Sequence, residues 1–346
     1  MMIEPERYTS GKIALVNLSA SIDALESRRT HSASFDELVG LSKLLFVRGD
    51  VLGCIADHDR AESIANEAIA MCDGTAGALH VSAKLAARFH RFREAEDLLD
   101  QALAMLHPRN EIDAQRAALL QATGRFEAAL MLRERLAEQD PSIQTIGALA
   151  SLLAEMGQWT AAEQSYSNAV QTDDGVSPFP PAQLLFEWGV SAMRRGKLDK
   201  ADAVLAELGV ILPAHVPGRG HRAEIALARG DLDLAMALIV PLIETSDDPE
   251  YRAIYAEILA ACGDDRADDE AEHAARDYEM LLARRPAAYA DHAAAFFMGV
   301  GKRPQRALEL ASANWRLRDT PRSRSLLANA QRGAQAASTL TEYRAC

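Results

Sequence analysis

Three residues near the middle of the chain have the types needed to bind an anion. In the stretch PAHVPGRGHRAEIAL, Arg219, His221 and Arg222 gather where a glycine-containing segment is expected to start a helix. Backbone N–H groups at a helix N-terminus, together with arginine side chains, bind carboxylate and phosphate groups. We therefore predict an anion site at Arg219, His221 and Arg222, with a solvated connector between two helices as the alternative.

A second cluster has the residue types of a metal site. Cys54, Asp57, His58 and Asp59 offer thiol, carboxylate and imidazole groups, which are ligands of zinc. The same residues also form the polar turn expected between two helices, and a local stretch alone does not supply a fixed ligand shell. We predict no metal and no cofactor. The chain has 4 cysteines and no CxxC spacing, which favours reduced thiols and a cytoplasmic location.

Sequence signatures of catalysis are missing. FFMGVGK, which ends at Lys302, contains a GxGK fragment but lacks the first glycine of a phosphate-binding loop and has Arg303 where Ser or Thr should follow. It is predicted to be a turn between helices. HExxH and GxSxG are also absent. We predict that the protein is not an enzyme; an enzyme or metal carrier whose side chains converge from distant segments remains the alternative.

Charge and hydropathy exclude two classes of partner. The 50 acidic and 37 basic residues give a net charge of -13, which repels nucleic-acid phosphates and anionic lipids. No apolar segment reaches the length of about 18 residues that a membrane span needs, and the apolar run from Ile13 to Val16 is too short for a signal peptide. We expect no nucleic-acid partner and no membrane association.

The elements that must position these residues repeat along the chain. In GRFEAALMLRERLAEQDP, Gly124 precedes Phe126 and Ala129, and the segment ends at Pro141. The same frame recurs from anchor positions 56, 90, 124, 157, 196, 230, 263 and 301, which are 34, 34, 33, 39, 34, 33 and 38 residues apart. A nearly constant period of this length is typical of helical-repeat proteins. Scarce strand-like alternation also favours helices.

The repeating unit resembles that of the tetratricopeptide-repeat (TPR) family, a 34-residue helix-turn-helix with the pattern W-x2-L-G-x2-Y, then A-x3-F, A and P. The first large position is usually not tryptophan here. The resemblance covers roughly residues 42–320 and implies an all-α, right-handed superhelical solenoid of about eight stacked hairpins. The unit that matches best contains Leu185, Trp188, Gly189, Ala192, Ala201, Leu205, Leu208 and Pro213.

Three regions are expected on this basis. Residues 1–41 should form an N-terminal capping helix region, residues 42–320 the repeat array, and residues 321–346 a C-terminal capping helix and tail. Insertions are expected near 171–183 and 263–277. The first is predicted to be a longer surface connector, with a hinge as the alternative. The acidic residues of the second should occupy the first turn of a helix, where they complement its dipole.

In the resembled family, helix A of each repeat lines a concave groove, and its fifth and ninth places point inward. The resemblance implies a positive stripe at one end of the groove, made by His80, Lys84 and Arg88, and an acidic far end. We predict a partner-binding groove formed by His80, Lys84, Arg88, Gln121, Ser151, Phe186, Val190, Arg194, Glu224 and Glu257.

The predicted function is a non-catalytic cytoplasmic scaffold or adaptor, of bacterial style, that binds a protein or peptide in this groove. The alternative is a sensor that changes the curvature of the superhelix when it binds a small ligand or a signalling peptide. The family's two-carboxylate clamp is not expected, because Asp50, Ala118 and Ser151 stand at ninth places where the clamp needs Asn.

Overall fold

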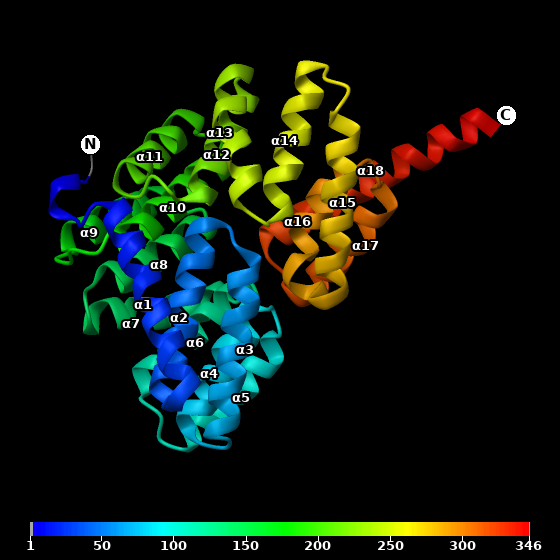
Figure 1. Cartoon of the computed structure of the whole chain (residues 1–346). Helices are drawn as coiled ribbons and strands as arrows, with labels where there is room; N and C mark the ends of the chain where they lie inside the picture. The colour runs from blue at the N-terminus through cyan, green and yellow to red at the C-terminus, as the bar shows by residue number, and fades with distance from the viewer. Residues whose placement is uncertain (1–2, 346) are drawn as a thin grey trace.

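The computed structural model describes residues 3–345 of the chain. All regular structure in this part is helical, and no strand is formed. Figure 1 shows the helices stacked side by side along a curved path from the N-terminus to the C-terminus. The all-α prediction is confirmed. None of the described helices combines the length and the apolar character that crossing a membrane requires.

Consecutive helices pair into eight hairpins within the described residues, as predicted, and a single helix flanks the array at each end. A 3-10 turn, η1 (Pro5–Arg7), precedes the first single helix, α1 (Gly11–Ser32), and α18 (Pro321–Ala345) is the last. The hairpins are α2 (Phe35–Leu52) with α3 (Ile55–Met71), α4 (Ala76–Arg88) with α5 (Phe92–Ala104), α6 (Arg109–Ala122) with α7 (Phe126–Gln139), α8 (Ile143–Glu155) with α9 (Trp159–Thr172), α10 (Phe179–Arg194) with α11 (Leu198–Ile211), α12 (Val216–Ala228) with α13 (Leu232–Thr245), α14 (Pro249–Cys262) with α15 (Ala267–Arg284), and α16 (Pro286–Met298) with α17 (Pro304–Leu317).

Each hairpin turn contains one residue with a left-handed backbone, which glycine adopts at least cost. In two turns the left-handed residue is not the predicted anchor. It is Gly53 instead of Ala56 in the α2–α3 turn, which is shorter than the pattern assumed, and Lys302 instead of Gly301 in the longer α16–α17 turn. The left-handed residues of the eight turns are Gly53, His90, Gly124, Gly157, Gly196, Gly230, Gly263 and Lys302.

Small residues bring the two helices of a hairpin close together. A Cβ atom on Gly189 of α10 would lie 2.6 Å from the Leu205 side chain of α11, and one on Gly49 of α2 would overlap the His58 ring of α3. Larger side chains fill the space between neighbouring hairpins. Tyr166 of α9 and Trp188 of α10 stack with ring centroids 5.3 Å apart, a contact that contributes about 0.5–1.5 kcal/mol beyond burial.

The two insertions differ in kind. At the first, only residues 173–178 lie outside helices, and the Thr9 N–H donates to the Val176 carbonyl at 2.8 Å. This fastening favours the connector over the hinge. At the second, the extra residues lengthen α15 to 18 residues, and Asp268, Asp269 and Glu270 occupy its first turn as predicted. The first repeat helix begins at Phe35, inside the segment expected to be a cap.

The array curls until its early turns lie against its late linkers, along a line that we call the seam. The turns at 53–56, 89–91 and 124 lie against the linkers at 246–247, 285–287 and 319, respectively. The turns of the first, second and third hairpins therefore contact the linkers that follow the sixth, seventh and eighth hairpins. The same offset holds at the N-terminus. Gly11, before the first hairpin, lies against the Ile211 carbonyl at the end of α11, which ends the fifth hairpin.

Polar groups hold the seam together. The Asp247 carboxylate accepts hydrogen bonds from the N–H groups of Ile55 at 2.6 Å and Ala56 at 2.9 Å, so it caps α3 from a distant hairpin. Arg285 pairs with Asp59 at 2.5 Å, and its guanidinium lies 4.1 Å from the centroid of the Phe89 ring. No feature of the repeat pattern had indicated these contacts, because they join hairpins that are far apart in sequence.

Candidate functional site

A cavity of about 510 Å³ lies inside the seam, where α4 and α6 face α16. Its walls combine polar side chains with three aromatic rings. The lining residues are His58, Lys84, Ala87, Arg88, Phe89, His90, Phe92, Gln115, Ala118, Leu119, Ala122, Ala288 and Tyr289. Two residues of the predicted groove, Lys84 and Arg88, are therefore on its wall.

Lys84 is a cation of this cavity that is not part of an ion pair. Its ammonium forms no ion pair or hydrogen bond with any side chain that the structure describes, and the residue is exposed. Desolvation lowers the pKa of Lys84, and the charge of Lys43 lowers it further, while the charge of Glu111 acts in the opposite direction. An unpaired, partly desolvated cation gains more from binding an anion than a fully hydrated one does.

Gln115 stands beside it on α6 and has unused hydrogen-bonding groups. The residue is 9% exposed, and neither its amide oxygen nor its amide nitrogen has a partner in the described part of the chain. Both polar atoms of this amide are closed to solvent, and a buried amide without partners costs free energy. The α4–α6 wall of the cavity is therefore chemically unsatisfied.

Arg88 behaves differently from Lys84. Its guanidinium pairs with the Asp50 carboxylate, lies 3.0 Å from Nε2 of His58, and sits over the Phe46 ring at 4.4 Å. Although burial alone would raise it, the pKa of Asp50 is held below its usual value by hydrogen bonds from His58 and Arg88. Arg88 therefore supports the cavity wall and has its charge already matched.

His80 does not belong to the predicted positive stripe. Its side chain is buried, at 4% exposure, and burial followed by the charge of Lys84 lowers its pKa to about 4, so the ring is neutral at pH 7. The fifth place of helix A packs against the next hairpin; Gly147 likewise contacts Leu184, and Gly220 contacts Tyr251. Of the three residues in the predicted stripe, Lys84 is therefore the one that carries a charge without an ion pair.

The middle of the predicted groove lies apart from the cavity. The Gln121 amide oxygen accepts a hydrogen bond from Arg133 at 3.4 Å. Phe186 packs against His221 with ring centroids 5.6 Å apart. Ser151 and Val190 are half-buried, and Arg194 is exposed.

The residues predicted to form the acidic far end of the groove carry a reduced charge. The Glu224 carboxylate lies 2.5 Å from Nδ1 of His221. Glu257 is half-buried, and burial followed by the charge of Glu224 raises its pKa to about 7. Near neutral pH, Glu257 therefore carries only part of a negative charge.

At the start of α12, where we predicted an anion site, most of the polar groups have partners within the protein. Arg222 donates to Asp202 at 2.8 Å, and His221 is held by Glu224. Nδ1 of His215 accepts the Gly218 N–H at 3.0 Å and so caps the helix itself. Of the predicted trio, Arg219 alone has no carboxylate partner within the described residues. Neighbouring carboxylates and a self-cap occupy the groups that an anion would need.

The suspected metal cluster in the α2–α3 turn is also dispersed. The Asp57 carboxylate accepts two hydrogen bonds from Arg48, each at 2.7 Å. His58 faces Asp50, and Asp59 reaches across the seam to Arg285. Cys54, Cys72 and Cys262 form no disulfide, whereas Cys346 lies outside the described residues.

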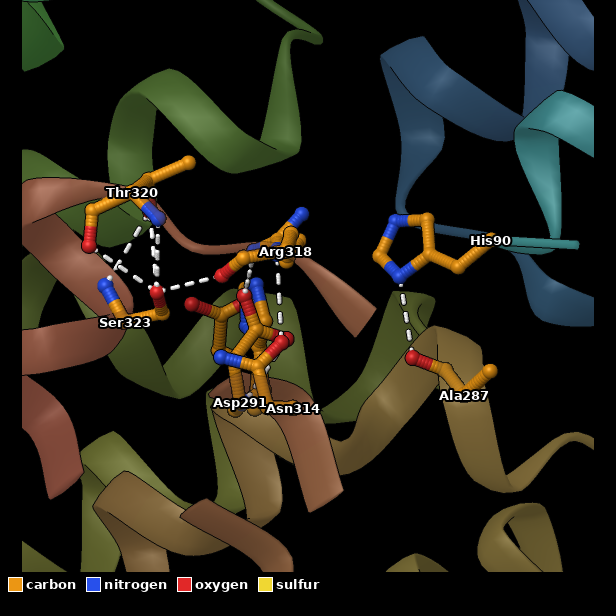
Figure 2. Close-up of polar contacts among 9 residues, drawn as sticks. His90, Ala287, Asp291, Asn314, Arg318, Thr320 and Ser323 are labelled. Atoms are coloured by element: carbon orange, nitrogen blue, oxygen red, sulfur yellow. Dashed lines mark hydrogen bonds and ion pairs between the residues drawn. The ribbon is translucent and has the colours of Figure 1, made fainter. Parts of the chain in front are cut away.

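Helix α16 also carries a paired charge, outside the residues that line the cavity, in contrast to the α4–α6 wall. Asp291, at 4% exposure, binds the Arg318 guanidinium at 2.5 Å, and Arg318 also donates to Asn314 at 3.1 Å. Figure 2 shows this group next to His90, whose Nδ1 donates to the Ala287 carbonyl across the seam at 2.9 Å. The pKa of Asp291 is lowered well below its usual value by nearby cations, His292 and Arg318 foremost, in spite of its burial.

Sequence reasoning missed Gln115, His90 and Tyr289 as cavity residues. One signal was present for His90, which stands where seven other turns have glycine or lysine and takes a strained backbone with φ of 59°. A non-glycine residue at such a position indicates a compensating contact, and the hydrogen bond to Ala287 is that contact. Gln115 and Tyr289 have no such signal.

Comparisons with known proteins show the fold. Scans against protein-family models and curated proteins find no match. Among solved structures, a chain of the APC/C hetero-tetramer Cut9-Hcn1 has a TM-score of 0.51 at 15% identity, covering 89% of this chain and 58% of that one. A tetratricopeptide repeat protein from Parabacteroides merdae ATCC 43184 has a TM-score of 0.47 at 18% identity, covering 81% and 98%.

A third similar structure is a thermophilic TPR protein from Thermus thermophilus, TTC0263, with a TM-score of 0.41 at 23% identity, covering 59% of this chain and 98% of that one. The chain has the TPR type of fold, an all-helical solenoid of stacked hairpins. At these identities the likeness extends to the fold alone.

Proposed function

We propose that the protein is a non-catalytic scaffold or adaptor that binds a polypeptide on the inner face of its solenoid. An acidic group of that polypeptide sits against Lys84. The observation that carries the proposal is the unpaired Lys84 ammonium beside the unpartnered Gln115 amide in one cavity. The TPR type of fold supports a protein partner, since such solenoids present extended concave binding surfaces.

The cavity walls define the segment that fits. A carboxylate receives a charge-assisted hydrogen bond from Lys84, and such bonds contribute about 1.5–3 kcal/mol. Phe89, Phe92 and Tyr289 offer apolar contacts beside it. The preferred segment therefore carries a carboxylate next to an apolar or aromatic side chain. The similar Cut9-Hcn1 structure is itself an assembly of protein chains, which is consistent with this class of partner.

The test is a peptide library measured by fluorescence polarisation with the purified full chain. Each peptide that carries Asp or Glu beside an apolar residue has a counterpart with Asn or Gln. We expect saturable binding of a subset, and about tenfold weaker binding of the uncharged counterparts, which corresponds to about 1.4 kcal/mol. The proposal fails if no peptide saturates the protein or if the counterparts bind equally well.

The volume of the cavity favours a second candidate, a sensor for a small ligand. Its value of about 510 Å³ falls within the range of about 300–1,000 Å³ that small-molecule sites occupy. A library of small carboxylic acids in a thermal-shift assay separates the two candidates. A sensor is stabilised by a small molecule alone, whereas an adaptor responds only to polypeptides.

A further inference from the structure

Three metal-ligand side chains converge where the α5–α6 linker meets α4. Oε2 of Glu111, in the first turn of α6, lies 3.4 Å from Nδ1 of His80 and 3.4 Å from Nε2 of His107. The three ligand atoms all lie within 4.8 Å of one another. The two imidazole rings have centroids 4.2 Å apart and are tilted by 46°.

The spacing suits a shared ion better than it suits hydrogen bonds. N–H···O bonds in proteins are usually about 2.7–3.2 Å long, so both contacts to Glu111 are stretched. Around a tetrahedral zinc ion with bonds of about 2.0–2.1 Å, neighbouring ligand atoms lie about 3.3 Å apart. Two edges of such a ligand triangle are thus already in place. The third, between His80 and His107, needs only to contract from a separation of at most 4.8 Å.

We propose that His80, His107 and Glu111 form a site for a divalent first-row transition-metal ion of the Zn²⁺ type, with one coordination position open to solvent. Two imidazoles and a carboxylate are a donor set that zinc uses when it keeps an open position. His80 is fixed by burial at 4% exposure, while Glu111 is exposed and free to adjust. The proposal does not depend on the peptide-binding function.

Neighbouring charges set the strength of this site. His80 faces Glu111, which attracts a cation, and Lys84 and Lys43, which repel it. Nε2 of His80 has no hydrogen-bond partner among the side chains that the structure describes, so burial orients the ring. We therefore expect moderate affinity that rises when the charge of Lys84 is removed.

A bound ion would fasten the α5–α6 linker to α4. This linker contains Leu106, which is exposed and has a left-handed backbone with φ of 64°. Without the ion, the linker contacts α4 here through the rings of His107 and His80, and Glu111 of α6 approaches His80 at 3.4 Å. The site would therefore cross-link two neighbouring hairpins. Its open coordination position would face solvent beside Glu111.

The experiment is calorimetric titration of ZnCl₂ into full-length protein that has been treated with EDTA and dialysed. We expect one equivalent bound to the wild type and at least tenfold weaker binding to His107→Gln and Glu111→Gln. His273→Gln is the matched control, because His273 is an exposed histidine on α15 beside Glu270. It should bind like the wild type, and Lys84→Gln should bind more tightly. Visible absorption with Co²⁺ reports the coordination geometry.

Two results overturn the site. The first is an absence of saturable zinc binding to the wild type. The second is unchanged binding in both His107→Gln and Glu111→Gln, which would place the zinc on other groups such as the free thiols. Circular dichroism of each variant checks the fold. Because His107 is half-buried and Glu111 is exposed, we expect both variants to keep the helical content of the wild type.

Discussion

The helices on the two sides of the central cavity use charge in opposite ways. On α16, outside the residues that line the cavity, the buried Asp291 carboxylate is paired with the Arg318 guanidinium, which also donates to Asn314. On the α4–α6 wall, the Lys84 ammonium and the Gln115 amide have no partners among the described residues. Burying polar groups is costly unless they are paired. The paired charge of α16 therefore stabilises the folded solenoid, and the unpaired Lys84 on the α4–α6 wall is available to a partner.

The largest effect should come from removing the partner of the buried Asp291 carboxylate on α16. Arg318→Leu leaves Asp291 buried without its closest counter-ion, and removal of one partner of a buried pair costs about 3–5 kcal/mol. We expect the lower end, because His292 and Arg322 also favour the ionised form of Asp291. Urea unfolding followed by circular dichroism measures the loss. Lys84→Leu is the matched variant and should change stability by no more than about 0.5 kcal/mol. Equal losses of unfolding free energy in the two variants would contradict the difference between Asp291 and Lys84.

A second test concerns the seam that brings the walls together. Gly124 has φ of 81°, and an added Cβ would overlap the Asp319 carbonyl, whereas Gly157 has φ of 77° with nothing nearby. Each glycine-to-alanine change costs about 1–2 kcal/mol for the left-handed backbone. Gly124→Ala should lose at least about 1 kcal/mol more, since the contact must open. Equal losses of unfolding free energy would show that the seam contributes nothing to stability.

A third test uses pH at the acidic end of the groove. The pKa of Glu257 is about 7 in the folded protein against a usual value of 4.5. Between these values the folded state keeps a proton that the unfolded state releases, so stability falls as pH rises. From pH 5 to pH 8, the wild type should lose on the order of 1 kcal/mol more than Glu257→Gln, after allowance for solvent screening. Parallel pH profiles of the two proteins would contradict the raised pKa.

The smallest effect is expected at α12. Arg222 is already paired with Asp202 at 2.8 Å, and both side chains are partly exposed. Arg222→Gln should therefore cost at most about 1 kcal/mol of stability and leave the affinity for acidic peptides within about twofold, a difference of roughly 0.4 kcal/mol. A large loss of affinity, measured by fluorescence polarisation, would move the acid-binding surface from α4 to α12.

Periodicity predicted the fold because each hairpin depends on local features. Gly189 permits close packing of its own hairpin, and Gly124 forms its own turn, so one unit of sequence contains the needed information. The placement of charges depended on non-local contacts. Whether Lys84 is free and Arg222 is paired depends on residues of other helices, and the seam joins turns to linkers some five hairpins away. His80 could not be assigned correctly because its burial results from packing against the next hairpin.

The central claim is that the unpaired charge of Lys84 receives an acidic group of a polypeptide. Isothermal titration of the best acidic library peptide into Lys84→Glu, with Lys12→Glu as an exposed control in the first turn of α1, tests it most directly. We predict a loss of at least tenfold for Lys84→Glu, near-normal binding for Lys84→Arg, and none of this loss for Lys12→Glu. Equal affinities of the wild type and Lys84→Glu would contradict the claim.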